Sequence, residues 1–93
     1  MGHDTQLKII AVTDALKEFL CEKNRRYGDS AINPMHVFSK ELPSEQLCVR
    51  LDDKLSRIRN GDELRKNDVV DTLGYMILLC IYKDWLDFED QID

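Results

Sequence analysis

Apolar residues recur at helical spacing in three long segments of this chain, whereas no segment alternates apolar with polar residues as a half-buried strand does. The pattern predicts helices over about residues 4–26, 43–60 and 67–88, each bounded by capping residues, glycine or proline. An Asn-Pro pair predicts a fourth, short helix over about 33–38, because proline suits the first position of a helix. The sequence therefore predicts an all-α fold, a compact bundle of about four helices of which three are long.

The third long segment is apolar nearly all round between residues 73 and 82, so we expect protein to surround this helix on every side. Gly74 costs about 1 kcal/mol relative to alanine inside a helix, which indicates a close helix contact there. A chain this short buries only roughly 60–65% of the surface of its unfolded state, and pairing of copies adds burial. We expect a single domain over residues 1–93 that forms a homo-oligomer, a dimer or larger, through this C-terminal helix.

The net charge of −5 comes entirely from the C-terminal tail, residues 84–93, which holds five acids and no lysine or arginine. The rest of the chain is neutral and lacks the basic footprint that coats nucleic acid through bulk charge, but a small phosphate-bearing ligand remains compatible with it. No leader pattern and no bilayer-spanning apolar run is present, and the three cysteines have no paired spacing. We expect a cytoplasmic protein with free thiols and no membrane partner.

The apolar stripe of the 43–60 helix consists of Leu47, Leu51, Leu55 and Ile58. A polar stripe lies beside it and consists of Arg50, Asp53, Lys54 and Arg57. The stripe has two interpretations. It can be a solvated face with an Asp53–Arg57 ion pair one turn apart. It can also be an anion site, in which the arginine forks grip phosphate oxygens and the lysine adds a point charge.

A second polar stripe, made of Asp68, Asp71 and Tyr75, begins the 67–88 helix and continues into apolar residues, so it is aimed toward protein. Two acids one turn apart can hold Mg²⁺ through oxygen ligands, and the metal would bridge to substrate phosphates. The alternative is structural, because acids in a first turn favour the helix dipole and Asp68 can cap the helix.

The first helix ends in a basic and aromatic segment that contains Lys23, Arg26 and Tyr27. Tyr27 can stack on a base while Lys23 or Arg26 meets a phosphate. The alternative is an ordinary basic helix end that complements the dipole. The chain contains no phosphate-binding glycine loop or zinc-protease motif, and His36 has no spacing that links it to a cysteine nucleophile. The residues therefore favour binding over catalysis.

Taken in order, these segments resemble the nucleotide modification associated domain 1 family, small helical proteins found mostly in bacteriophages. The resemblance covers residues 22–81. The matching positions are Lys23, Asn24, Tyr27 and Gly28 in a K-N-x-x-Y-G motif, Arg50, Asp53, Lys54 and Arg57 in R-x-x-D-K-x-x-R, and Asp71 with Tyr75 in D-x-x-x-Y. The resemblance implies a phage-type protein that acts on or binds nucleotides in the host cytoplasm.

A more distant likeness is to the all-α nucleoside triphosphate pyrophosphatases of the MazG type, which hold Mg²⁺ with two acidic motifs. Asp68 and Asp71 are similar to the second motif, and Asp52 with Asp53 can stand for the leading acids of the first. The first motif departs from the pattern, because Ser56 occupies the position of its last acid. This departure should weaken metal binding while still favouring a phosphate-bearing ligand.

Three hypotheses follow for the function. The leading one is a phage-type protein that binds a nucleotide or a nucleotide-derived signal of host immunity and sequesters it, without a cofactor. The second is a Mg²⁺-dependent nucleoside triphosphate pyrophosphohydrolase that uses Asp52, Asp53, Asp68 and Asp71. The third is a small adaptor that binds another protein through the 67–88 helix and the acidic tail.

Overall fold

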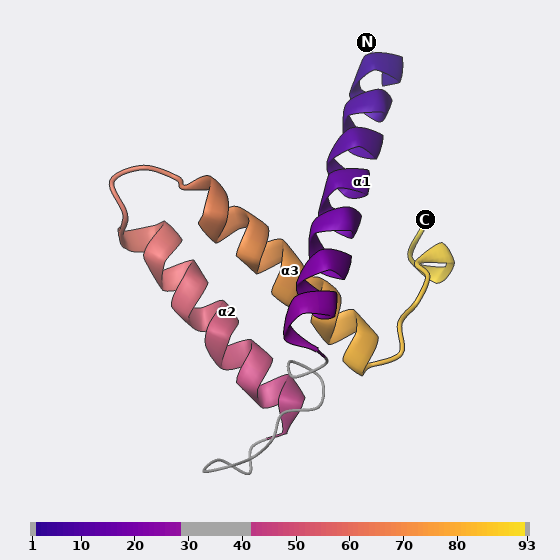
Figure 1. Cartoon of the computed structure of the whole chain (residues 1–93). Helices are drawn as coiled ribbons and strands as arrows, with labels where there is room; N and C mark the ends of the chain where they lie inside the picture. Colours follow the sequence, from indigo (N-terminus) through magenta and orange to yellow (C-terminus); the bar gives the residue numbers. More distant parts are fainter. Residues whose placement is uncertain (1, 29–41, 93) are drawn as a thin grey trace.

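The computed structural model describes residues 2–28 and 42–92, and every regular element in these two ranges is helical (Figure 1). The elements are the α-helices α1 (Gly2–Tyr27), α2 (Pro43–Asn60) and α3 (Lys66–Tyr82) and a short 3₁₀ helix, η1 (Glu89–Gln91). The prediction of an all-α fold with three long helices is confirmed. The short helix predicted over 33–38 lies outside the described residues, so the count of four stays a prediction.

α2 and α3 lie side by side and antiparallel, joined by the short connector 61–65 (Figure 1). Leu47 and Leu51 of α2 are the two apolar side chains buried between the helices, 1% and 8% exposed. Leu55 was predicted to continue this apolar stripe but is 52% exposed. Each step of four residues advances the side chain by about 40° around a helix, so Leu55 lies about 80° from Leu47 and leaves the interface.

α1 crosses α3 through its C-terminal half, and none of its described residues is buried. The crossing lies at Gly74, where an added Cβ atom would stand 3.0 Å from Cδ2 of Leu20. The close helix contact predicted for this glycine is confirmed. The N-terminal half of α1 extends beyond the α2–α3 pair (Figure 1).

α3 ends at Tyr82, so the prediction of a helix to about Phe88 is wrong. The chain closes the helix with a Schellman motif. Trp85 N–H donates to the carbonyl of Cys80 at 2.8 Å, Asp84 N–H donates to Ile81, and Asp84 takes the left-handed conformation at φ 59°. The apolar pattern continues past this point in Trp85 and Leu86, so it does not indicate where the helix ends. Aspartate is one of the few residues besides glycine that tolerates the left-handed conformation.

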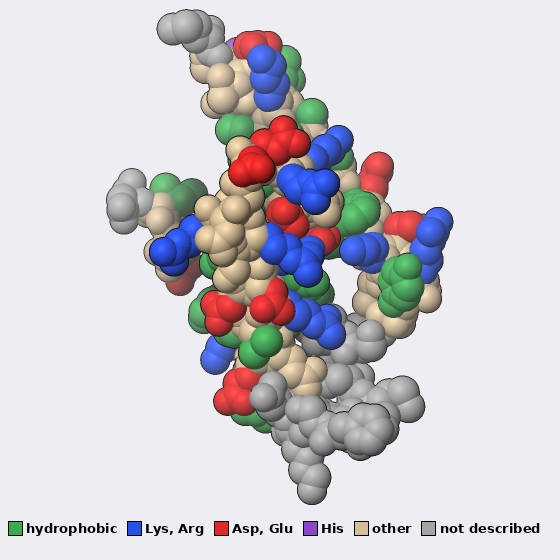
Figure 2. Space-filling view, turned by 90° about the vertical axis from the view of Figure 1, so that its left-hand side faces the viewer, with side chains coloured by type: hydrophobic (Ala, Val, Ile, Leu, Met, Phe, Trp, Pro, Cys, Tyr) green, Lys and Arg blue, Asp and Glu red, His purple; other side chains and the backbone are tan. Residues whose placement is uncertain are grey.

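The exposed surface mixes charges of both signs. Figure 2 shows acidic and basic side chains side by side on one face, with no large area of a single sign. Residues 83–92, which include most of the predicted acidic tail, are exposed throughout. Among the described residues, no helix combines the length and the apolar character that a bilayer span requires.

The side of α3 that faces away from α2 remains partly uncovered by the described chain. Leu73, Met76 and Ile81 are exposed there, although this helix was expected to be surrounded by protein. Contact with a second copy through this helix stays a prediction.

We expect Leu47→Ala to lower the free energy of unfolding by about 2–4 kcal/mol, because it removes most of a buried side chain and leaves a cavity. Leu55→Ala is the matched control and should cost well under half as much, since that side chain is 52% exposed. Urea unfolding followed by circular dichroism measures both. Equal losses would contradict the observed orientation of α2.

Candidate functional site

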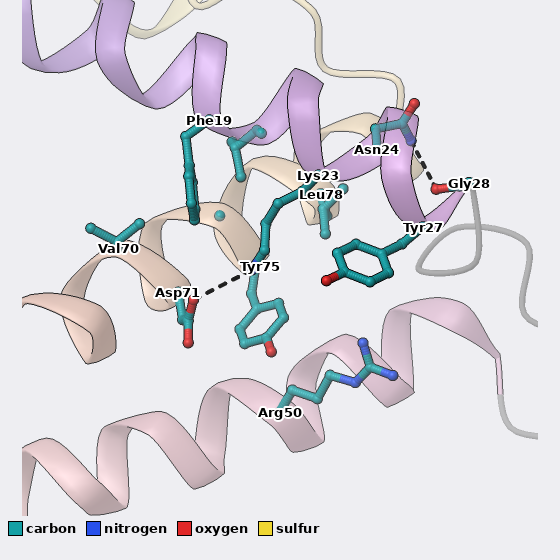
Figure 3. Close-up of a pocket in the computed structure, with 12 residues that line it drawn as sticks. Phe19, Lys23, Asn24, Tyr27, Gly28, Arg50, Val70, Asp71, Tyr75 and Leu78 are labelled. Carbon is teal, nitrogen blue, oxygen red and sulfur yellow. Dashed lines mark hydrogen bonds and ion pairs between the residues drawn. The ribbon is translucent and has the colours of Figure 1, made fainter.

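A cleft of about 380 Å³ opens where the C-terminal half of α1 faces α2 and α3 (Figure 3). Phe19 and Leu20 of α1 and Val70 and Leu78 of α3 supply its apolar wall. Its polar side chains are Lys23, Asn24 and Tyr27 of α1, Arg50 of α2, and Asp71 and Tyr75 of α3. A hollow of this size, apolar with a few convergent polar groups, is the usual form of a small-molecule site.

Helical spacing explains why these side chains converge. Lys23 and Tyr27 are four residues apart on α1, and Asp71 and Tyr75 are four residues apart on α3, so each pair lies one turn apart on one face. The crossing of the two helices turns both faces toward Arg50 on α2. Figure 3 shows Tyr27, Tyr75 and Arg50 pointing into the same space.

Lys54 does not line the cleft but binds Asp71, the acid that does. Its Nζ is 2.9 Å from a carboxylate oxygen of Asp71 and 3.6 Å from one of Asp68. The side chains of Lys54 and Asp68 are only 13% and 7% exposed. The hydrogen bond to Asp71 raises the pKa of Lys54 above its ordinary value, so the ammonium form persists and is neutralised by these two acids.

The two cations that line the cleft, Lys23 and Arg50, have different surroundings. Lys23 stands 3.9 Å from Asp71 and 5.0 Å from the centre of the Phe19 ring, a cation–π distance. Arg50 is exposed and makes no hydrogen bond or ion pair with any residue that the structure describes. The guanidinium of Arg50 is therefore available to an anion in the cleft.

The structure brings together five of the residues proposed for ligand binding: Lys23, Tyr27, Arg50, Asp71 and Tyr75. Arg26, Asp53, Lys54 and Arg57 do not line the cleft. Arg26 donates to Glu22 at 2.9 Å. The hydrogen bonds from Arg25 and then Arg26 lower the pKa of the Glu22 carboxyl group. The Asp53–Arg57 ion pair is not formed, and both side chains are exposed.

Sequence reasoning missed the apolar wall of the cleft, including Phe19. A signal was present, because Phe19, Lys23 and Tyr27 follow one another at intervals of four residues. The face of α1 that carries Lys23 and Tyr27 therefore continues one turn toward the N-terminus to Phe19, whose ring Lys23 covers.

The four acids proposed as Mg²⁺ ligands do not form one cluster. Within the described ranges, no group of three or more histidine, cysteine, aspartate or glutamate side chains is placed to hold a metal ion. Asp52 and Asp53 are exposed on α2, whereas Asp68 and Asp71 share the ammonium group of Lys54. Since a cation already stands between the second pair, these residues do not fit the predicted two-motif metal site.

We expect the contribution of Lys54 to stability to depend on alkaline pH. A lysine with a raised pKa in the folded state stabilises the fold fully below its ordinary pKa, about 10.4, and loses that effect as pH rises through the higher folded value. The difference in urea midpoint between the wild type and Lys54→Met should thus be largest below pH 10 and shrink above it.

Lys17→Met is the control for the lysine titration, because Lys17 is exposed and its one ion pair among the described residues is with Asp14 of its own helix, at 3.7 Å. This variant should stay close to the wild type at every pH. A difference for Lys54→Met that is constant from pH 8 to pH 12 would show that its charge does not stabilise the fold.

Comparison of the chain with protein-family models, with curated proteins and with solved structures gives no match. The resemblance to the nucleotide modification associated domain 1 family and the likeness to the MazG type therefore stay predictions that rest on short motifs. What the cleft binds has to be inferred from its own chemistry.

Proposed function

We propose that this protein binds a nucleotide or a nucleotide-derived small molecule in the cleft between α1, α2 and α3. The observation that carries the proposal is the guanidinium of Arg50, which has no partner among the described residues and faces two tyrosine rings across a hollow of about 380 Å³. An aromatic face suits a base, and an arginine fork suits a phosphate.

Each polar side chain of the cleft has a role in this proposal. Arg50 binds phosphate oxygens, and Lys23 adds a second positive charge beside it. Tyr27 or Tyr75 stacks on the base. Asp71, held in orientation by Lys54 at 2.9 Å, accepts hydrogen bonds from a sugar hydroxyl or a base amine.

The proposal assigns binding rather than turnover to the cleft. Lys54 occupies the space between Asp68 and Asp71, so these carboxylates are already compensated and orient a ligand instead of recruiting a cation. By analogy in size and ligand class with small helical phage proteins, we propose that the protein sequesters a nucleotide signal of host immunity in the host cytoplasm, as a homo-oligomer.

Arg50→Ala should weaken nucleotide binding at least tenfold, because a hydrogen bond to a charged group contributes about 1.5–3 kcal/mol. Arg57→Ala is the matched control: it removes the same side chain from the same helix but lies outside the cleft, so binding should be unchanged. Isothermal titration with a panel of nucleoside mono-, di- and triphosphates and cyclic nucleotides measures both variants. Equal affinities for the two variants would contradict the proposed site.

Sequestration also predicts that the bound molecule leaves the protein chemically intact. The protein is incubated with the same panel and Mg²⁺, and the complex is then denatured by heat. Mass spectrometry identifies the small molecules that are released. We expect unchanged nucleotides. Release of pyrophosphate that disappears in Asp71→Asn would instead identify a hydrolase, and retention of no nucleotide by the wild type would favour the adaptor hypothesis.

A further inference from the structure

The charged groups in and beside the cleft leave a single positive charge without compensation. Lys54 pairs with Asp71 at 2.9 Å and with Asp68 at 3.6 Å. Lys23 stands 3.9 Å from the same Asp71. These two lysines and two carboxylates cancel, so Arg50 is the cation of the cleft that no described residue neutralises. A ligand that complements this arrangement carries its negative charge in one group, at Arg50.

The other charges of the surrounding helices contribute less to this balance. Arg25 and Arg26 do not line the cleft, and both donate to Glu22, at 2.8 and 2.9 Å. Arg57 and Asp53 carry opposite charges on the exposed surface of α2, also outside the cleft. Because water and salt screen exposed charges, these groups act more weakly on a ligand than the side chains that line the cleft.

The helix end that reaches the cleft is the C-terminal end of α1. Tyr27, the last residue of α1, and Gly28 both line the cleft, and the Gly28 carbonyl accepts a hydrogen bond from the side chain of Asn24 at 3.2 Å. A helix C-terminus carries partial negative charge, whereas phosphate sites commonly use the N–H groups of a helix N-terminus. Figure 3 shows the guanidinium of Arg50 on the side of the cleft where Tyr27 lies. A phosphate added beyond the one at Arg50 would therefore lie near a repulsive helix end.

The size of the cleft sets a similar limit. Its volume of about 380 Å³ is near the lower end of the roughly 300–1,000 Å³ found for small-molecule pockets. Part of this space faces the apolar side chains of Phe19, Leu20, Val70 and Leu78, which suit a base but not a phosphate. The polar part near Arg50 thus has room for one phosphate rather than a chain of them.

We propose that the ligand of the cleft is a nucleotide with a single phosphate group, open or cyclic, and not a diphosphate or triphosphate. This inference rests on the proposed function and narrows its ligand class. The phosphate binds the fork of Arg50, the base lies against the apolar wall, and Asp71 accepts a hydrogen bond from the base or sugar. Each added phosphate would bring about one more negative charge without a cation to neutralise it.

Isothermal titration without Mg²⁺ tests the proposal on the wild type. The ligands are the monophosphate, cyclic monophosphate, diphosphate and triphosphate of each common ribonucleoside. For the base that binds most tightly, we expect a single-phosphate form to bind at least about tenfold more tightly than the triphosphate, since a charge without a partner is costly to desolvate. Which of the two single-phosphate forms binds more tightly distinguishes a phosphate monoester from a cyclic diester, and either result supports the proposal.

The titration separates this inference from the proposed function. A diphosphate or triphosphate that binds as tightly as the single-phosphate forms would overturn the inference and leave nucleotide binding intact. Absence of binding by every member of the series would overturn both.

A pair of substitutions tests the charge balance itself. Asp68→Asn removes a negative charge beside the cleft without changing a residue that lines it, so the affinity for the triphosphate relative to the monophosphate should rise by roughly threefold or more. Asp52→Asn is the matched control, because it makes the same change on an exposed side of α2, about 200° around the helix from Arg50, and should leave this ratio unchanged. Equal ratios in the two variants would overturn the proposal. If circular dichroism shows that Asp68→Asn does not fold, the wild-type series decides the case alone.

Discussion

The ammonium group of Lys54, bound between the carboxylates of Asp68 and Asp71, is the interaction on which the rest of this structure depends. It joins the middle of α2 to the start of α3, where Asp68 is nearly buried and would otherwise keep an uncompensated charge. The same contact sets the position of Asp71 at the edge of the cleft. One lysine therefore links the helix pair, which also packs through Leu47 and Leu51, to the geometry of the cleft.

The small size of the hydrophobic core shapes everything outside this helix pair. Only Leu47 and Leu51 are buried apolar side chains in the described residues. α1 contacts α3 at Gly74 and through the ion pair of Lys23 with Asp71. Such a core leaves Leu7, Ile9 and Ile10 of α1 more than half exposed. It also leaves two adjoining hollows, the cleft and a groove between α1 and residues 63–73. Phe19, Val70 and Asp71 line both of them, so a ligand in the cleft would lie against side chains that also line the groove.

Much of this arrangement could be predicted from the sequence. The start of α2 follows from proline at its first position, and the inward direction of Asp68 and the contact at Gly74 follow from helical spacing and propensity, all of which act over a few residues. The end of α3 could not, because Asp84 closes the helix with a conformation usually left to glycine while the apolar pattern continues. The exposure of Leu55 likewise depends on which side of α2 contacts α3, and a local sequence pattern does not contain this information.

For the site, the sequence by itself determined that Lys23 shares a face with Tyr27 and that Asp71 shares a face with Tyr75, because residues four apart lie one turn apart in any α-helix. Only the tertiary structure decided that these two faces meet at Arg50 and form one cleft. The tertiary structure also decided that Lys54 pairs with Asp68 and Asp71 of α3, whereas Arg57 does not line the cleft. The reason is physical: the rotation and crossing of packed helices depend on contacts between residues far apart in the chain, and those contacts determine which side of each helix becomes a site.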